Sequence, residues 1–141
     1  MSQTVEFDVA APPDRVWAVL SNVDLWPEWT PTVTSVTRPD HGPLRVGSHA
    51  KVTQPRLADA EYVVTEVIPG SSFTWEAARP GLRTTAMHRI EPLPDGGAHV
   101  ALSIEQHGFL GPMVGRLYRG LTDEYLHNEA NGLKHRCEDA A

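Results

Sequence analysis

The sequence predicts an α+β fold, in which an antiparallel sheet packs against one long helix near the C-terminus. Twelve prolines and eleven glycines divide the 141 residues into short segments, and short segments between such breakers are typical of strands. The final stretch is different, because it has apolar residues at helical spacing and no internal proline. An antiparallel sheet needs a cover for its apolar face, and this helix is the only element long enough to provide one.

The N-terminal third predicts one strand and two short helices. Residues 4–9 alternate apolar and acidic side chains, as a half-buried strand does. Pro12-Pro13-Asp14 then begins a helix, because proline is tolerated in the first helical turn and an acid is favoured at the positive end of the helix dipole. Residues 24–29 can form only a turn or two of helix, because Pro27 restricts the backbone of Trp26.

Six strands and the final helix complete the order of elements. We expect the strands over residues 33–37, 46–54, 61–68, 72–78, 82–91 and 99–106. One continuous amphipathic helix is expected from Gly111-Pro112 to about Arg136. Together with the first strand, this order predicts a seven-stranded sheet within a single domain that spans residues 1–141.

The turn at residues 68–71 predicts which side chains share a face of the sheet. A tight turn there pairs Val67 with Ser72 and Val64 with Trp75. The side chains that this register places on one face are Tyr62, Val64, Phe73, Trp75 and Ala77, with Glu66 near its end.

The turn at residues 93–97 allows two registers. A four-residue loop mixes apolar and charged side chains on both faces, whereas a five-residue loop separates them. Because a slip of one residue exchanges the two faces, we favour the five-residue loop. The face that it directs toward the final helix holds Thr84, Ala86, His88, Ile90, Val100, Leu102, Ile104 and Gln106.

Composition excludes several classes of protein. A net charge of −6 argues against nucleic-acid binding, which depends on neutralising phosphates. No apolar run approaches the ~20 residues of a membrane span, so we expect no membrane insertion. We expect no signal peptide from the first eight residues, and the single cysteine, Cys137, is what we expect in a reducing cytoplasm. The seven histidines show no zinc-ligand spacing, and we expect neither a metal nor a cofactor.

Several motifs resemble those of one superfamily. The stretch 7–20 and the following Trp26-Pro27-Glu28-Trp29-Thr30-Pro31 resemble the opening of SRPBCC proteins, which are also called START-like or helix-grip proteins. His88-Arg89-Ile90-Glu91-Pro92, Asp95-Gly96-Gly97 and Gly111-Pro112 are similar to later parts of the same pattern, so the resemblance covers nearly the whole chain. It implies a curved sheet and two short helices wrapped around the C-terminal helix, with an internal apolar cavity.

The resemblance points to the polyketide cyclase/dehydrase and lipid transport group of that superfamily. It implies that a small hydrophobic or aromatic molecule binds in the cavity and is cyclised or dehydrated there by positioning and proton transfer. The alternative is a carrier or sensor that binds a hydrophobic ligand without changing it. The sequence leaves open whether the protein is an enzyme and whether it has a protein partner.

Candidate ligand-binding residues come from the aromatic side chains and from the face of the sheet turned toward the helix. Rings offer a large contact area, and Trp and Tyr add one polar group for orientation, although plain core packing explains each ring about equally well. The candidates are Trp26, Trp29, Tyr62, Phe73, Trp75, Thr84, Ala86, Gln106, Leu117, Tyr118, Leu121 and Tyr125.

His88 is the candidate catalytic residue. The favoured register places it among apolar side chains that face the final helix, where an imidazole can transfer a proton to or from a bound ligand. The competing interpretation is a buried histidine whose ring is hydrogen bonded to a tyrosine or to the backbone, and it is the one that we favour.

Overall fold

The computed structural model describes residues 2–40 and 42–139, and it contains one antiparallel sheet with helices on one side. The strands are β1 (Ser2–Val9), β2 (Ser35–Thr37), β3 (His49–Thr53), β4 (Ala60–Ile68), β5 (Ser72–Arg79), β6 (Leu82–Pro92) and β7 (Ala98–His107). The helices are α1 (Pro13–Ser21), the 3-10 helix η1 (Val23–Glu28), α2 (Gly111–Leu117) and α3 (Arg119–Asp139). The strand order is β1-β7-β6-β5-β4-β3-β2, as expected for a curved seven-stranded sheet.

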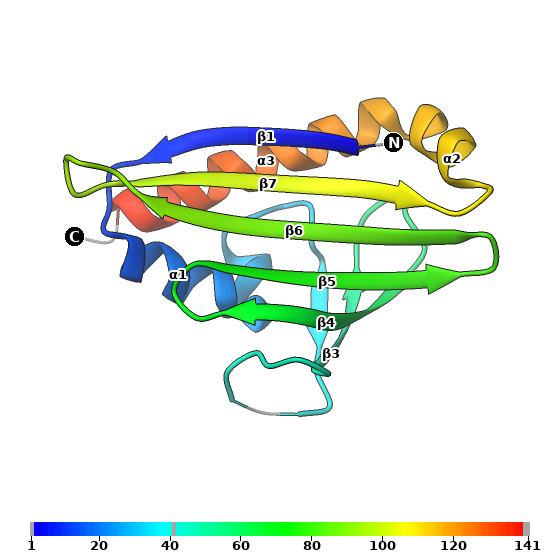
Figure 1. Cartoon of the computed structure of the whole chain (residues 1–141), viewed down its shortest axis with the longest axis horizontal. Coiled ribbons are helices and arrows are strands. Elements are labelled where there is room, and N and C mark those ends of the chain that lie inside the picture. Colours follow the sequence, from blue (N-terminus) through cyan, green and yellow to red (C-terminus); the bar gives the residue numbers. More distant parts are fainter. Residues whose placement is uncertain (1, 41, 140–141) are drawn as a thin grey trace.

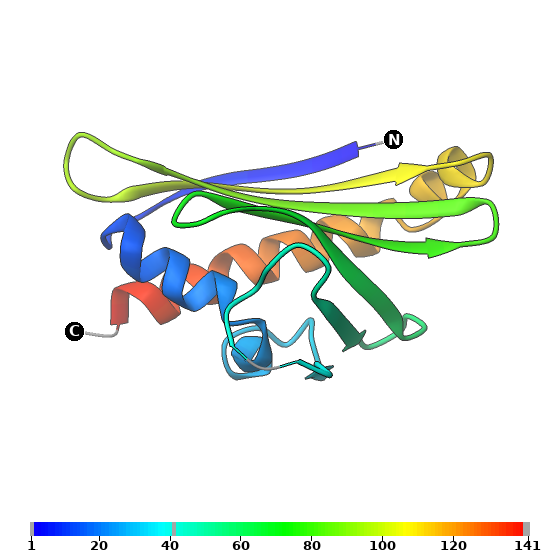
Figure 2. The ribbon, with the colours of Figure 1, turned by 60° about the horizontal axis from the view of Figure 1, so that its bottom comes forward.

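The sheet curves around α3. Figure 2 shows α3 running along one face of the sheet, with α1 on the same side and the β3 end of the sheet bending toward the helices. The fully buried core lies in this layer and includes Val16 and Leu20 of α1, Phe73 of β5, Ile90 of β6 and Leu133 of α3. The predicted helix-grip architecture is therefore confirmed.

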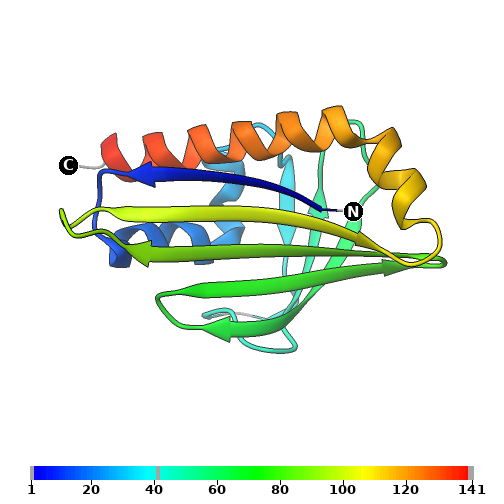
Figure 3. The same ribbon diagram turned by 45° about the horizontal axis from the view of Figure 1, so that its top comes forward.

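The final helix is divided, and the prediction of one continuous helix was wrong. α2 ends at Leu117 and α3 begins at Arg119, and Figure 3 shows the two meeting at an angle. Tyr118 lies between them with φ −100° and ψ 12°. α2 is held against the end of β7, since a Cβ on Gly111 would lie 2.8 Å from the Gln106 carbonyl oxygen. α2 therefore packs against the end of β7, while α3 runs along the face of the sheet (Figure 3).

The β4–β5 hairpin corrects one predicted register. Val64 pairs with Trp75 as expected, but Val67 pairs with Phe73 instead of Ser72, because a bulge lies between Val64 and Glu66. The extra residue in β4 reverses the faces beyond the bulge. As a result, Val67 packs against the core and Glu66 is exposed.

The β6–β7 hairpin has the predicted five-residue loop. Pro92 pairs with Ala98, and the register continues through His88 opposite Leu102. The predicted segregation of faces follows from this register. It places His88 on the face that the helices cover, with 5% of its surface exposed.

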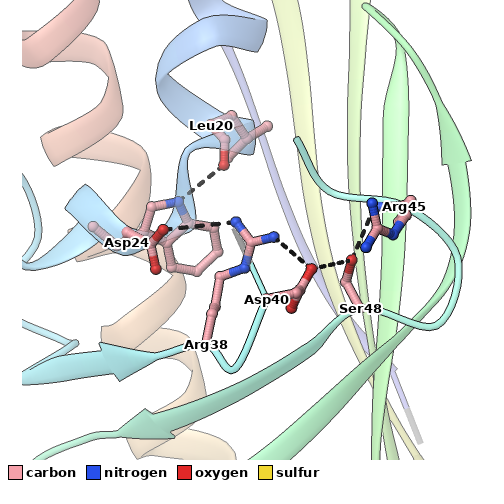
Figure 4. A network of polar contacts seen from close by, with 7 residues as sticks. Leu20, Asp24, Arg38, Asp40, Arg45 and Ser48 are labelled. Atoms are coloured by element: carbon pink, nitrogen blue, oxygen red, sulfur yellow. Dashed lines mark hydrogen bonds and ion pairs between the residues drawn. The ribbon is translucent and has the colours of Figure 1, made fainter. Parts of the chain in front are cut away.

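The strands before β4 are shorter than predicted, because the chain between them forms a braced loop. Figure 4 shows the Arg38 guanidinium between two carboxylates, 3.6 Å from Asp24 and 3.1 Å from Asp40. Ser48 Oγ donates a hydrogen bond to Asp40 and accepts one from the Arg45 amide. Asp24 belongs to η1, so this buried arginine ties the loop to the short helix that carries Trp26.

Candidate functional site

A cavity of about 300 Å³ lies between the sheet and α3. Its wall is formed by strands β3 to β7, by η1 and by both C-terminal helices. The lining residues that are buried in the fold, and that mark its deep part, are Trp26, Val33, Val52, Trp75, Ala86, His88, Leu102, Tyr125 and Leu126.

The mouth of the cavity is marked by lining residues that are exposed to solvent. These are Ala58, from the loop before β4, Arg79 at the end of β5, and Tyr118 between α2 and α3. Thr84 and Gln106 also line the cavity, and the Thr84 hydroxyl donates a hydrogen bond of 2.7 Å to Gln106 Oε1. The mouth therefore lies between the loop before β4, the end of β5 and the junction of α2 and α3.

Three aromatic side chains form one wall. The Tyr62 ring stacks on Trp75 with 4.9 Å between ring centroids, and Trp26 lies 5.4 Å from Trp75. The Trp26 indole donates a hydrogen bond of 2.9 Å to the Leu20 carbonyl, so its orientation is fixed from outside the cavity. Such a wall offers flat apolar contact area to a ligand.

His88 occupies the deep part of this wall. Its ring stacks on Phe73 at 4.0 Å, and Nδ1 lies 3.1 Å from the Phe73 carbonyl oxygen. A carbonyl can only accept, so Nδ1 carries the proton and Nε2 is left as an acceptor. Burial lowers the pKa of His88 to about 4, and the imidazole is therefore neutral near pH 7. The hydrogen bond to the backbone is the structural role that we favoured from the sequence.

Glu129 is a polar lining residue that was not among the predicted site residues. It lies in the middle of α3, is half-buried, and accepts a hydrogen bond of 3.3 Å on Oε1 from the Thr32 hydroxyl. Thr32 is joined in turn to Thr30 by a hydroxyl contact of 2.9 Å, and both threonines are buried. Burial raises the pKa of Glu129 to about 7, and the Thr32 hydrogen bond only partly opposes that effect.

No basic side chain in the part of the chain that the structure describes offsets the burial of Glu129. Among the described residues, no lysine, arginine or histidine forms an ion pair with Glu129, and Oε2 has no hydrogen-bond donor. The Glu129 carboxylate also acts on Tyr62 of the aromatic wall. The pKa of Tyr62 is raised to about 12, mainly by burial and to a lesser extent by the nearby carboxylate. A carboxyl group with a pKa near neutrality can both donate and accept a proton.

The structure brings together most of the residues predicted as ligand-binding. His88 lines the cavity with eight of them, namely Trp26, Tyr62, Trp75, Thr84, Ala86, Gln106, Tyr118 and Tyr125. The Tyr125 hydroxyl donates to the Pro55 carbonyl, which ties α3 to the loop before β4.

Four predicted residues lie outside the cavity lining. Phe73 is on the expected face but is covered by His88, on which it stacks. Trp29 lies behind Trp26, against α3, where a Cβ on Gly132 would clash with the Trp29 carbonyl oxygen. Leu117 is exposed and Leu121 half-buried, because the break at Tyr118 ends the helical face on which they were predicted to lie.

Within residues 2–40 and 42–139, no group of three or more His, Cys, Asp or Glu side chains is arranged to hold a metal ion. None of the helices in the same part of the chain is long and apolar enough to cross a membrane. The titratable side chains that line the cavity are Tyr62, Arg79, His88, Tyr118, Tyr125 and Glu129.

Residues 2–138 match the profile of one protein family, described as polyketide cyclase / dehydrase and lipid transport. The chain belongs to this family. That membership agrees with the superfamily resemblance of the sequence motifs. No curated protein matches the sequence significantly.

Solved structures similar to this family member share its fold at low sequence identity. The protein TTHA0849 from Thermus thermophilus is 15% identical, with a TM-score of 0.78 over 100% of this chain and 99% of that one. A START superfamily protein from Mycobacterium smegmatis is 20% identical, with a TM-score of 0.73 over 100% and 98% of the two chains. The di-domain ARO/CYC protein BexL from the BE-7585A biosynthetic pathway is 16% identical, with a TM-score of 0.71 over 96% of this chain and 45% of BexL.

Proposed function

We propose that the protein binds a small, mainly apolar or aromatic molecule in the cavity and promotes its cyclisation or dehydration by positioning and proton transfer. The observation that carries the proposal is the Glu129 carboxyl group, which lies on an aromatic and apolar wall without a basic partner among the described residues. A largely desolvated carboxylate without a basic partner costs stability, and groups with shifted pKa values cluster at functional sites.

Glu129 supplies the proton transfer. With a pKa of about 7, the group is present in both protonation states at neutral pH, as a general acid or base requires. In its ionised state it removes a proton from a carbon next to a ligand carbonyl, and in its protonated state it returns that proton to carbon or to a departing hydroxyl. Thr32 holds Oε1, which leaves Oε2 for the ligand.

His88 and Tyr62 orient the ligand in this proposal. Nε2 of the neutral His88 accepts a hydrogen bond from a ligand hydroxyl, whereas the Tyr62 hydroxyl remains protonated and donates to a ligand carbonyl. His88 is a weak base at a pKa of about 4, so the catalytic role that the sequence assigned to it passes to Glu129. Holding a flexible chain in a reactive arrangement can itself lower the barrier by up to ~7–11 kcal/mol.

The test is proton exchange on an enolisable aromatic ketone. We expect the protein to accelerate exchange of the C1 protons of 2-tetralone in deuterated buffer, followed by proton NMR. Glu129→Gln should lower the protein-catalysed rate by about 10²-fold or more, whereas the surface variant Glu124→Gln on the same helix should keep it. Binding of 2-tetralone without accelerated exchange would instead identify a carrier, and the absence of binding would contradict the proposal altogether.

Native mass spectrometry of the purified protein identifies the natural ligand. The released molecule is then incubated with fresh protein and with the Glu129→Gln variant. A chemically altered product formed by the native protein alone supports catalysis, whereas a ligand returned intact by both proteins supports transport.

A further inference from the structure

α2 carries a row of exposed apolar side chains. Phe109, Met113 and Leu117 are 84%, 59% and 72% exposed. They are spaced four residues apart, so they lie along one side of the helix and of the turn that precedes it. α2 is found at the end of the molecule where β5 also turns into β6 (Figure 1).

The opposite side of α2 is also apolar. Val114 lines the cavity, and Gly111 is buried against the end of β7. Phe109 is held outward by the β5–β6 turn, since a Cβ on Gly81 would lie 2.6 Å from its ring. The side of a helix that faces solvent usually carries polar side chains, yet the outer side of α2 carries this apolar row beside Arg116.

The charged side chains of α2 and of the first residue of α3 are basic, although the whole chain carries −6. Arg116 and Arg119 are exposed, and within the described part of the chain neither side chain forms an ion pair with an acid. No aspartate or glutamate occurs from residue 106 to residue 122. Apolar side chains flanked by unpaired arginines match a surface that is both apolar and anionic.

We propose that the α2 surface, formed by Phe109, Met113, Leu117, Arg116 and Arg119, docks the protein on an anionic lipid bilayer. The apolar side chains enter the boundary between headgroups and acyl chains, and the two arginines remain at the level of the lipid phosphates. The three apolar side chains expose on the order of 400 Å². That is about half of the ~800 Å² that each partner contributes to a stable protein interface.

The α2 surface lies next to the mouth of the cavity. Tyr118 marks the mouth of the cavity, and Val114 links the wall of the cavity to the outer side of α2. Docking therefore brings the mouth close to the bilayer, from which an apolar ligand can pass into the cavity without crossing bulk water. The path of the ligand rests on the proposed binding function, whereas docking itself concerns a different surface from Glu129 and does not depend on proton transfer.

The test is co-sedimentation with lipid vesicles. We expect the native protein to bind vesicles of phosphatidylcholine that contain phosphatidylserine, and to bind pure phosphatidylcholine at least about tenfold more weakly. Replacing Phe109, Met113 and Leu117 together by serine should lower the partition coefficient by about 10²-fold. Arg116→Gln with Arg119→Gln should remove the preference for anionic vesicles and its sensitivity to salt.

The matched control replaces two exposed apolar residues elsewhere, Val46 and Ile68, by serine. This variant should bind vesicles as the native protein does, and circular dichroism should show that all variants remain folded. Three results would overturn the proposal: no binding of the native protein, an equal loss in the control, or a stable dimer in solution that the triple serine variant converts to monomer. The last result would make the α2 surface an interface between two copies.

Discussion

The hydroxyl of Thr32 donates a hydrogen bond of 3.3 Å to Oε1 of Glu129, and so joins the loop after η1 to the middle of α3 at the wall of the cavity. Three further links hold this part of the fold. Arg38 ties η1 to the following loop, the Trp26 indole is bonded to α1, and the Tyr125 hydroxyl ties α3 to the loop before β4. These contacts tie together the elements on both sides of the Glu129 carboxyl.

Glu129→Gln is expected to stabilise the protein at neutral and alkaline pH. The pKa of Glu129 is raised from 4.5 to about 7, so the native fold favours the protonated form. The contribution of protonated Glu129 to the free energy of unfolding is complete below pH 4.5 and is lost as the pH rises through about 7. The glutamine of the variant cannot ionise, so the free energy of unfolding of the variant exceeds that of the native protein by an amount that grows between pH 4.5 and 7, to at most about 3 kcal/mol. Urea unfolding at pH 5 and pH 8 measures the difference, and an equal stability of both proteins at pH 8 would contradict the account.

His88 should give the opposite pH dependence. Its pKa falls from 6.5 to about 4 in the fold, so the neutral ring is required, and stability decreases as the pH falls from 6.5 toward 4. The full effect is on the order of 3 kcal/mol. His88→Gln should be less stable than the native protein at pH 7, but its stability should change less between pH 6.5 and 4.

The control for this measurement is His135→Gln, because the His135 side chain is 77% exposed on α3. Between pH 6.5 and 4, the free energy of unfolding of the control should change with pH as steeply as that of the native protein. If the free energy of unfolding of the His88 variant depends on pH as steeply as that of the native protein, the His88 ring is not buried in its neutral form.

Two glycines of α3 should respond in opposite ways to alanine. A Cβ on Gly132 would clash with the backbone of Trp29, whereas nothing lies within 4 Å of one on Gly120. Gly132→Ala should therefore destabilise the protein by about 1–3 kcal/mol. Gly120→Ala should leave it unchanged or stabilise it by up to about 1 kcal/mol. Thermal unfolding of both variants tests the close contact between α3 and Trp29, and a neutral Gly132→Ala would argue against that contact.

The sheet was predictable because its signals are local. The five-residue loop at residues 93–97 follows from the separation of apolar and polar side chains, and it placed His88 on the covered face. The bulge between Val64 and Glu66 was not predictable, because Thr65 resembles an ordinary strand residue and the extra residue is fixed by pairing with β5. Gly47, at φ +93°, does not have an extended backbone, so β3 begins at His49 and not at Val46 as predicted.

The site was predicted only in part, because a cavity depends on how distant elements meet. The aromatic candidates were chosen for the chemistry of their side chains. That chemistry could not show that Trp29 lies behind Trp26 or that His88 covers Phe73. A signal for Glu129 was present, since it follows Tyr125 by four residues and precedes Leu133 by four on the buried side of α3. The Thr32 contact joins residues 97 positions apart, and no sequence pattern indicates it.

The central claim is that the space between the sheet and α3 is a ligand-binding cavity, and calorimetric titration with 2-naphthol tests it most directly. Ala77 lines the cavity, whereas its neighbour Ala78 is exposed on the other face of β5. We predict that the native protein and Ala78→Phe bind about one molecule per chain, and that Ala77→Phe, which fills the cavity, binds at least about tenfold more weakly. Equal binding by both variants, or no saturable binding by the native protein, would contradict the claim.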